Sequence, residues 1–449
     1  MPPIRIVVAG GNYAGLNAVR HLYATLIASP PPSSAQTSET TNTVVDQVED
    51  GNSGGNAVEI TLIDKRDGFL HYIGITRGFT EPEFGADLWV PYATVPWLQH
   101  PSIKIRHATV TRITPNEVHL EEAGAVVPFD YLVIALGETR AAPIGTDALT
   151  KDQFVATLGA VHRQIRQART VAVVGAGAVG IEMAADIKCD FEEKRVILAH
   201  SRALPLPGPF KDEFRQQVVG ILESIGVDVM LGQRVIEQVP GPSADGNVIT
   251  PTPTTDSSND EDGSEYMLTL ADGRKIAADC VIRCLGAELD SNLGLLELPV
   301  DDDDNKDNSG PIFGPSGIRV RDTMQVDSDR YPHIYACGDI CSRDKVKLAG
   351  VAMYGGYIAA RNIARSVLAQ RNSKNESVEV VLEKGTLYPP KILLLLGKDE
   401  FAMQLDQEIW EKESVRPFVY DDMGLKVSVE GLSLTQTPEH DGDLGISTD

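Results

Sequence analysis

The strongest constraint on the fold is an internal repeat. The first copy begins with a mostly apolar run at residues 4–10 that enters a group of glycines, and it closes at residues 129–137. The second copy begins in the same way at residues 170–175 and closes at residues 278–286. Both closing segments carry an Asp before a buried-strand pattern and finish in Leu-Gly. A strand, a Gly-rich turn and a helix form a βαβ unit, so the duplication predicts an α/β protein with two Rossmann-like dinucleotide-binding domains, each built on a parallel sheet.

The second copy carries a complete nucleotide-binding pattern. Residues 175–180 read G-x-G-x-x-G, directly after a predicted strand and directly before an apolar helix at residues 181–187. Such glycines allow a tight turn and close approach to a pyrophosphate, while the helix N-terminus offers N–H groups and a positive dipole. A plain structural turn is the competing interpretation, and the flanking strand and helix disfavour it. The residues assigned to NAD(P)H here are Gly175, Gly177, Val179 and Gly180.

The first copy departs from this pattern. Residues 10–15 read GGNYAG, which keeps the first and third glycines but places Asn12 at the second. We expect Gly11 to allow the close approach to the cofactor in its place. The residues assigned to the first nucleotide on this basis are Gly10, Gly11, Asn12, Ala14 and Gly15.

The distance to a ribose-binding acid tests this assignment. The acid is expected about 20 residues past the motif. Asp64 lies 49 positions after Gly15, and removal of the 29 residues of 29–57 leaves 20. The sequence therefore predicts an insertion between the first helix and the second strand, with Asp64 at the adenosine ribose. An exposed Asp at a strand end is the alternative.

The same count in the second copy reaches no acid. Twenty positions past Gly180 is His200, followed by Ser201 and Arg202. A carboxylate selects the free 2′-hydroxyl of NAD, whereas an Arg accommodates the 2′-phosphate of NADP. NADPH is therefore the favoured nucleotide for this domain, with a solvated loop as the alternative role of Arg202.

Three stretches have compositions that cannot build a core. Residues 29–57 hold four acids and no base, residues 241–265 hold six acids and no base, and residues 299–308 carry a net charge of −4. We expect mobile insertions or loops there. Residues 427–449 add −5 and are expected to form an acidic tail. Of the total charge of −24, only about −5 then remains for the predicted folded body.

Composition also excludes several classes of protein. A net charge of −24 disfavours nucleic acid, which proteins bind through clustered Lys and Arg. No apolar run approaches the roughly 20 residues that cross a bilayer. A strand predicted from about residue 4 leaves no room for a signal peptide. The five cysteines fit a reducing compartment, so a cytoplasmic location is expected. No His and Cys cluster has zinc-ligand spacing, so no metal site is expected.

A third motif carries a resemblance to a known family. Residues 331–340, YPHIYACGDI, resemble the second FAD motif of the two-dinucleotide-binding-domain flavoprotein oxidoreductases. The resemblance implies a glutathione-reductase-like fold in which Asp339, after Gly338, contacts the ribityl and phosphate part of FAD. It also implies that the helix from about Leu348 points its positive end at the flavin, where it would stabilise negative charge on the reduced ring.

The chain resembles one branch of that family in particular, the apoptosis-inducing-factor-like, mitochondrion-associated branch that includes ferroptosis suppressor proteins. Type II NADH dehydrogenases are more distantly similar. The motifs that carry this resemblance lie at residues 67–71, 180–188, 198–201, 346–350 and 393–398. The branch implies an FAD-dependent NAD(P)H:quinone oxidoreductase. It also implies peripheral contact with a mitochondrial or lipid-droplet surface as one option, and it leaves the oligomeric state open. Pro2 stands where the lipid-anchored member has its myristoylated glycine, which puts stable anchoring in doubt.

The resemblance divides the chain into four segments. Residues 1–150 and 309–370 form a discontinuous FAD domain, residues 151–298 form the NAD(P)H domain, and residues 371–449 form a small α+β interface domain. Strands are expected at residues 378–383 and 391–396, the second as a buried central strand. The remaining residues assigned to FAD are Lys65, Arg77, Val110, Ala135, Gly137 and Lys347, and Gly286 joins the NAD(P)H set.

Three residues are candidates for catalysis. Glu182 follows the second glycine motif, where the resemblance places a Glu near nicotinamide and flavin; a favourable first-turn carboxylate is its plain alternative. Lys347 opens the last helix and would hold negative charge on the reduced ring or on a quinone oxygen. His71 is a candidate proton donor to reduced quinone, although a lone His is more often structural.

Cysteine spacing argues against a disulfide reductase. Such enzymes need a C-x-x-C or C-x-x-x-x-C pair beside the flavin, whereas the closer pairs here, Cys280 with Cys284 and Cys337 with Cys341, are C-x-x-x-C. Two alternatives remain open: a reductase of an electron-carrier protein, and a signalling flavoprotein with slow turnover.

Overall fold

The computed structural model describes residues 2–28, 57–122, 124–240, 266–299, 312–372, 380–419 and 421–435. Almost all of the three predicted insertions, and residues 436–449 of the predicted tail, lie outside the described residues. Residues 427–435 belong to the folded body, which corrects the predicted tail. A charge count overlooks the apolar Leu432 and Leu434, whose side chains are buried.

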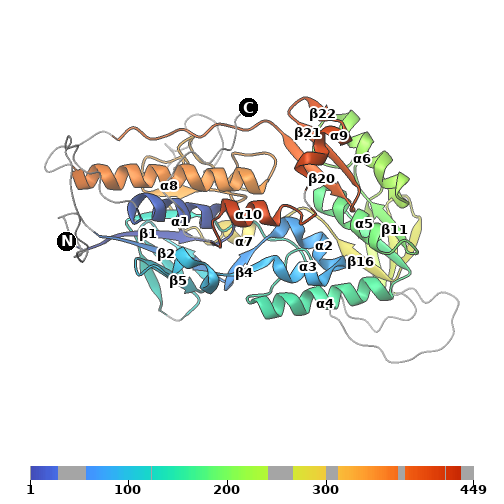
Figure 1. The fold of residues 1–449 in the computed structure, drawn as a ribbon, viewed down its shortest axis with the longest axis horizontal. Helices are drawn as coiled ribbons and strands as arrows, with labels where there is room; N and C mark the ends of the chain where they lie inside the picture. Colours follow the sequence, from blue (N-terminus) through green and yellow to red (C-terminus); the bar gives the residue numbers. More distant parts are fainter. Residues whose placement is uncertain are drawn as a thin grey trace, which may run out of the picture.

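The first domain is a parallel sheet with strand order β19-β9-β1-β2-β5. Its strands are β1 (Ile4–Ala9), β2 (Val58–Asp64), β5 (Ile103–His107), β9 (Tyr131–Ile134) and β19 (Ile334–Ala336). Because β19 comes some 200 residues after β9, the domain is discontinuous, as predicted. Helices α1 (Tyr13–Leu26) and α8 (Ala349–Asn372) lie side by side on one face (Figure 1). The meander β6 (Val110–Ile113), β7 (Glu117–Leu120) and β8 (Val126–Pro128) covers the other.

The second domain repeats this design. Its parallel sheet has the order β12-β11-β10-β16. Its strands are β10 (Thr170–Val174), β11 (Arg195–Ala199), β12 (Val227–Met230) and β16 (Cys280–Arg283). Helices α4 (Lys151–Gln167), α5 (Ala178–Asp190) and α6 (Asp212–Ser224) share one hydrophobic core with this sheet. A second meander, β13 (Val235–Pro240), β14 (Tyr266–Leu270) and β15 (Lys275–Ala278), covers the opposite face. The predicted repeat is therefore confirmed at the level of whole layers.

The chain returns to the first domain earlier than the predicted boundary at residue 298. Thr139 pairs with Glu288, and Ile113 pairs with Leu296. Leu298 is buried against the first meander. The leucines of this segment complete the core of the first domain, which explains the early return. The short helix α7 (Asp290–Leu293) and the strands β17 (Phe313–Gly314) and β18 (Gly317–Ile318) lie in the same connection.

Short elements follow Asp64 in the first domain. They are β3 (Gly68–Leu70), η1 (Tyr72–Gly74), α2 (Ile75–Thr80), α3 (Pro82–Asp87), β4 (Trp89–Pro91), η2 (Tyr92–Thr94) and η3 (Pro96–Gln99). Helix α2 reaches the second domain, where it packs on α5. Among the residues that the structure describes, no helix combines the length and apolarity needed to cross a membrane.

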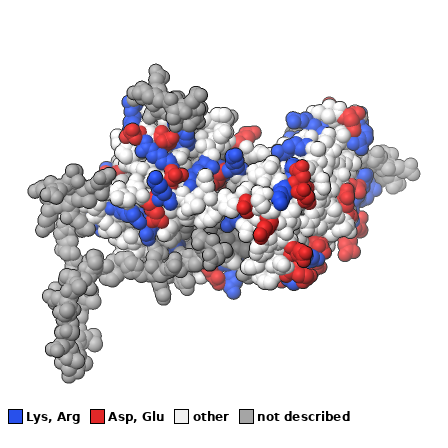
Figure 2. Space-filling view, turned by 90° about the horizontal axis from the view of Figure 1, so that it is seen from above, with Lys and Arg blue, Asp and Glu red and all other residues white. Residues whose placement is uncertain are grey.

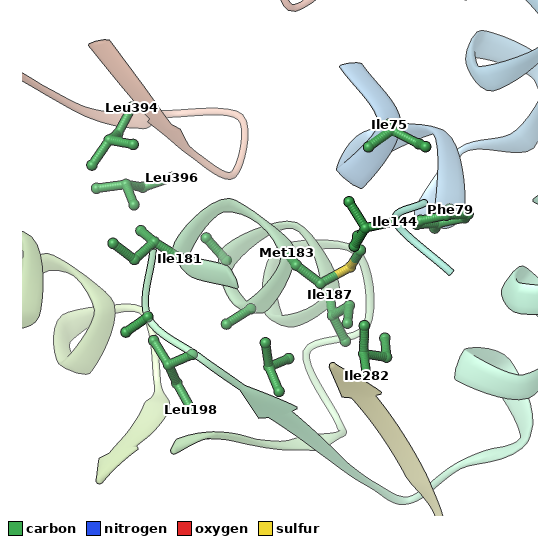
Figure 3. Close-up of a cluster of buried hydrophobic side chains, with 14 of the residues drawn as sticks. Ile75, Phe79, Ile144, Ile181, Met183, Ile187, Leu198, Ile282, Leu394 and Leu396 are labelled. Atoms are coloured by element: carbon green, nitrogen blue, oxygen red, sulfur yellow. The ribbon is translucent and has the colours of Figure 1, made fainter. Parts of the chain in front are cut away.

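The C-terminal domain is a small antiparallel sheet with helices. It contains β20 (Lys391–Leu396), β21 (Glu400–Leu405), β22 (Glu408–Trp410), α9 (Lys412–Val415), η5 (Arg416–Phe418) and α10 (Leu425–Gly431). Leu394 and Leu396 of β20 face Ile181 on α5 (Figure 3). The predicted strand at residues 391–396 is confirmed and largely buried, but the strand order β20-β21-β22 places it at an edge, so its predicted central position was wrong. One face of β20 packs on helix α5, while one edge of β20 pairs with no further strand among the described residues.

The strand predicted at residues 378–383 is absent from the described part of that segment, residues 380–383. Asn362 on α8 takes the place of a partner strand. Its amide nitrogen donates to the Glu383 carbonyl at 2.9 Å, and its amide oxygen accepts from the Glu383 N–H at 2.7 Å. A side chain thus satisfies the backbone groups that strand pairing would have used.

Helices α1 and α8 approach each other most closely at Gly356. A Cβ atom built there would lie 2.1 Å from the carbonyl oxygen of Ala14, so any side chain would push the helices apart.

We predict that Gly356→Ala lowers the free energy of unfolding by about 1–3 kcal/mol, the usual cost of overpacking. Gly220→Ala on α6 is the control, because nothing lies within 4 Å of a Cβ at Gly220 and alanine favours a helix by up to about 1 kcal/mol. Urea unfolding of both variants measures the difference. Equal stability of the two variants would contradict the close packing of α1 on α8.

Candidate active site

The first glycine loop connects β1 to α1. Gly10 has φ of +101°, and a Cβ atom there would lie 2.2 Å from the carbonyl oxygen of Ala135. Asn12 caps α1, since its side-chain oxygen accepts from the Tyr13 N–H at 3.0 Å. The other N–H groups of the first helical turn remain available to a phosphate.

Asp64 lies at this loop, as the corrected spacing predicts. Its Oδ2 accepts from the Gly11 N–H at 2.6 Å, and its Oδ1 accepts from the Arg66 N–H at 2.8 Å. Gly11 has a different role from the predicted one: a Cβ atom there would lie 2.3 Å from the hydroxyl of Tyr92, which donates to the Gly11 carbonyl at 2.7 Å. Gly11 thus admits a tyrosine. The partner is 81 residues away in the chain, which is why the motif alone did not reveal it.

Arg66 is a residue that the sequence analysis missed. Its guanidinium lies 3.6 Å from Asp64 and donates to the Tyr72 hydroxyl at 2.9 Å, whereas the predicted Lys65 is exposed. The buried Nε of Arg66 has no hydrogen-bond partner among the described residues. An arginine two positions after the ribose-binding acid would have been the sequence signal for it.

The second FAD motif meets the first one. A Cβ atom at Gly338 would lie 3.0 Å from the Cβ of Ala14, so the two motifs are in contact. Beside them, at the N-terminus of α8, lies an open hollow. The residues that line it include Gly338, Asp339, Cys341, Arg343, Lys347, Leu348, Ala352 and Gly355. Burial raises the pKa of Asp339 to about 6.

Lys347 lies in this hollow, as predicted, and its ammonium group donates to the carbonyl of Cys341. Val110, Ala135 and Gly137, also assigned to FAD, lie near the same sheet edge. Val110 begins β6, and Gly137 has φ of +67° with open space at its Cβ position. The hollow, the first turn of α1 and the carboxylates of Asp64 and Asp339 are the groups that could hold an extended dinucleotide.

The second glycine loop repeats the geometry of the first. Gly175 has φ of +111°, and a Cβ atom there would lie 2.3 Å from the carbonyl oxygen of Cys284. The Ala176 N–H donates to His200 Nδ1 at 3.1 Å, which is the counterpart of the Gly11 contact with Asp64. His200 therefore occupies the position of Asp64, and Arg202 that of Arg66.

The space around this second loop is open. A Cβ atom at Gly177 or Gly286 would meet nothing within 4 Å, and Ser201 and Arg202 are exposed. Nε of Arg202 lies 3.4 Å from Nε2 of His200. Burial, with Arg202 and Arg215 nearby, lowers the pKa of His200 and keeps the ring neutral.

Glu182 lies where α5 meets the C-terminal domain. Its Oε1 accepts from the Leu395 N–H of β20 at 3.2 Å. Burial raises the pKa of Glu182 to about 8. A backbone N–H of the edge strand β20 thus donates to the Glu182 carboxyl group, whose pKa lies near neutral pH.

His71 does not face an acceptor site. It is 0% exposed, its Nε2 donates to the Met423 carbonyl at 3.0 Å, and its Nδ1 accepts from the Tyr13 hydroxyl at 3.0 Å. Both ring nitrogens are therefore occupied, which gives His71 a structural role in place of the predicted proton transfer. Its pKa is lowered by burial.

Arg77 is likewise engaged away from the glycine loops. Its guanidinium bonds to Asp186, to the Gly397 carbonyl and to the Asp421 carbonyl, so these contacts assign it to the junction between domains and not to FAD. Its partners lie more than 100 residues away in the chain, so no local pattern could indicate them.

All five cysteines are free. Burial raises the pKa of Cys337 to about 12 and that of Cys341 well above its ordinary value. A thiol with so high a pKa supplies almost no thiolate near neutral pH, so disulfide exchange at these positions is disfavoured.

A family model described as pyridine nucleotide-disulphide oxidoreductase matches residues 4–356. The chain belongs to this family. Membership implies the use of a flavin and of NAD(P)H, which agrees with the two glycine loops. The chain is therefore an NAD(P)H-dependent oxidoreductase of this family.

Similar proteins come from the predicted branch. Oxidoreductase OXR1 of Ajellomyces capsulatus is 29% identical over 97% of this chain and 89% of its own length. Ferroptosis suppressor protein 1 of Homo sapiens is 27% identical over 69% of this chain and 75% of its own length. Apoptosis-inducing factor homolog A of Dictyostelium discoideum is 26% identical over 78% of this chain and 80% of its own length. These relatives confirm the resemblance found in the sequence.

Solved structures confirm the fold. The water-forming NADH oxidase of Lactobacillus brevis, bound to NADH, matches with a TM-score of 0.59 at 16% identity, over 92% of this chain and 77% of its own. Reduced Bacillus anthracis CoADR-RHD matches with a TM-score of 0.59 at 16% identity over 93% of this chain, which spans only 64% of that protein.

The raised pKa of Glu182 predicts a pH dependence of stability. A carboxyl group whose pKa is about 8 in the folded protein and 4.5 as a free side chain stabilises the fold fully below pH 4.5 and loses that contribution as pH rises through 8. We expect Glu182→Gln to remove a loss on the order of 1 kcal/mol per pH unit in this window. Urea unfolding at several pH values measures it. Glu223→Gln, at an exposed position on α6, is the control, and an unchanged slope in the Glu182 variant would refute the assignment.

Proposed function

We propose that the protein is an FAD-dependent NAD(P)H:quinone oxidoreductase. The observation that carries this proposal is that the chain holds two glycine loops of different chemistry, in domains that pack together through α2 and α5, and has no C-x-x-C cysteine pair. Without a dithiol, electrons would leave to a small acceptor. The resemblance to the apoptosis-inducing-factor-like branch supports a quinone as that acceptor.

The chain's own residues would hold FAD along the carboxyl edge of the first sheet. The first turn of α1 would offer N–H groups to the pyrophosphate, Asp64 would accept from the adenosine ribose, and Asp339 would accept from the ribityl side. Lys347 adds a positive charge in the hollow at the start of α8. FAD, when bound, would accept two electrons from the nicotinamide and pass them to the acceptor.

Glu182 is the proposed proton-holding group at the meeting point of α5 and β20. With a pKa of about 8 its carboxyl group is mostly protonated at neutral pH, so a proton is available at Oε2, because Oε1 accepts from the Leu395 N–H.

The differences between the two glycine loops support NADPH as the donor. In the first loop the carboxylate of Asp64 accepts hydrogen bonds and balances the charge of Arg66. In the second loop a neutral imidazole stands at the same position, and among the described residues no carboxylate pairs with Arg202. The guanidinium of Arg202 and the hydroxyl of Ser201 are both donors, which suits a 2′-phosphate and not a free 2′-hydroxyl.

We therefore predict that Arg202→Gln raises KM for NADPH by about 10- to 100-fold, the value of one or two charge-assisted hydrogen bonds, and changes KM for NADH by less than about 3-fold. Steady-state kinetics with both nucleotides measures this. Arg195→Gln, at an exposed position paired with Asp228 on the same domain, is the matched control. Equal losses for NADPH and NADH would refute the 2′-phosphate assignment.

Steady-state NADPH consumption with and without a soluble quinone tests the reaction itself. We expect purified protein to carry FAD and to oxidise NADPH several-fold faster when quinone is present. Slow consumption that quinone does not accelerate would favour a signalling flavoprotein, and acceleration only by a small electron-carrier protein would favour a carrier reductase. The cytoplasmic location and peripheral membrane contact expected from the sequence stay predictions.

A further inference from the structure

Three parts of the protein meet at one buried side chain, Arg77 on α2. Its Nη2 donates to Oδ1 of Asp186 on α5 at 3.3 Å and to the carbonyl of Gly397 in the β20–β21 turn at 2.8 Å. Its Nη1 donates to the carbonyl of Asp421, in the segment that leads into α10, at 3.1 Å. Arg77 is 5% exposed. One guanidinium therefore joins the first domain, the second domain and the C-terminal domain.

Stability alone explains this group poorly. Buried ion pairs contribute little net stability compared with well-packed apolar side chains, because both charges lose their water. The Nε of Arg77 also has no hydrogen-bond partner among the described residues. What the guanidinium does provide is a defined register, since it ties Asp186 on α5 and the Gly397 carbonyl of the β20–β21 turn to one side chain of α2.

The placement of α5 matters for chemistry. Helix α5 begins at Ala178, within the proposed NADPH loop Gly175–Gly180, and the same helix carries Glu182 one turn before Asp186. Helix α2 belongs to the domain that would hold FAD. A displacement of about 1 Å between reacting groups can slow a reaction by about 100-fold.

We infer that Arg77 is a positioning residue for electron transfer from NADPH to the flavin, because it fixes the NADPH-binding helix α5 against the FAD domain. This inference rests on the proposed function. It assigns Arg77 no contact with either cofactor.

A second ion bridge spans the same elements and provides a matched control. Lys398, in the β20–β21 turn, lies 3.0 Å from Glu81 between α2 and α3 and 2.8 Å from Asp190 at the end of α5. The side chain of Lys398 is 57% exposed, and exposed ion pairs hold their partners weakly. Lys398→Gln should therefore leave the geometry between the domains unchanged.

The experiment compares Arg77→Met, Arg77→Lys, Asp186→Asn and Lys398→Gln in the full-length, FAD-loaded protein. Anaerobic stopped-flow mixing with saturating NADPH gives the rate of flavin bleaching, and its concentration dependence gives the Kd. We expect bleaching to slow at least 10-fold in Arg77→Met with the Kd within about 3-fold, partial rescue in Arg77→Lys, and a rate within 2-fold of wild type in Lys398→Gln.

A second readout does not depend on activity. Hydrogen exchange of the nucleotide-free protein should show faster exchange in α5 and in the β20–β21 turn for Arg77→Met, and wild-type exchange for Lys398→Gln. If Arg77→Met fails to fold, Asp186→Asn is the deciding variant, because it keeps both carbonyl contacts of Arg77. Bleaching that is several-fold slower in Asp186→Asn would then support the inference.

A wild-type bleaching rate in Arg77→Met, or in Asp186→Asn where the first variant does not fold, would overturn the inference. So would a Kd for NADPH that rises in parallel with the loss of rate. Failure of NADPH and NADH to bleach the wild-type flavin would instead refute the proposed function, so the two failures are distinguishable.

Discussion

The close packing of α8 on α1 is the contact on which the rest of the structure depends. At Gly356 the two helices approach so closely that no side chain fits between them. Helix α8 follows β19, the strand by which the last third of the chain joins the first sheet. This packing brings the Gly338–Asp339 motif against Ala14 of the first glycine loop, and so assembles one site from segments more than 300 residues apart.

Duplication supplied one scaffold and two chemistries. In each copy the N–H of the second loop residue bonds to a side chain at the end of the second strand, Asp64 in one and His200 in the other. The backbone contact is the same, while the side chain beside the loop changes from a carboxylate to an imidazole. One fold thus carries two loops of different chemistry.

The net charge of −24 belongs to the full sequence and is not typical of the surface formed by the described residues. Figure 2 shows acidic and basic side chains interspersed over the face it draws, without a continuous basic area. Most of the excess acid lies on segments outside the described residues. Nucleic-acid binding stays disfavoured, and the local charge at each site is set by a few residues such as Arg202 and Asp339.

Local patterns in the sequence were sufficient for the layers, the glycine loops and Asp64, because strand-turn-helix units are written in consecutive residues. They failed where the deciding partner is distant. His71 is held by Met423, Arg77 by Gly397 and Asp421, and Gly11 by Tyr92. The predicted strand near Glu383 failed for the same reason, since Asn362 on α8 satisfies its backbone.

Anaerobic single turnover tests the central claim most directly. The FAD-loaded protein is mixed first with one equivalent of NADPH and then with a soluble quinone, while flavin absorbance is followed. Two nucleotide sites that serve one flavin predict full bleaching by NADPH and full recovery of the oxidised spectrum, with one quinol formed for each NADPH. Bleaching without recovery on quinone addition would contradict the account, as would a flavin that NADPH leaves oxidised.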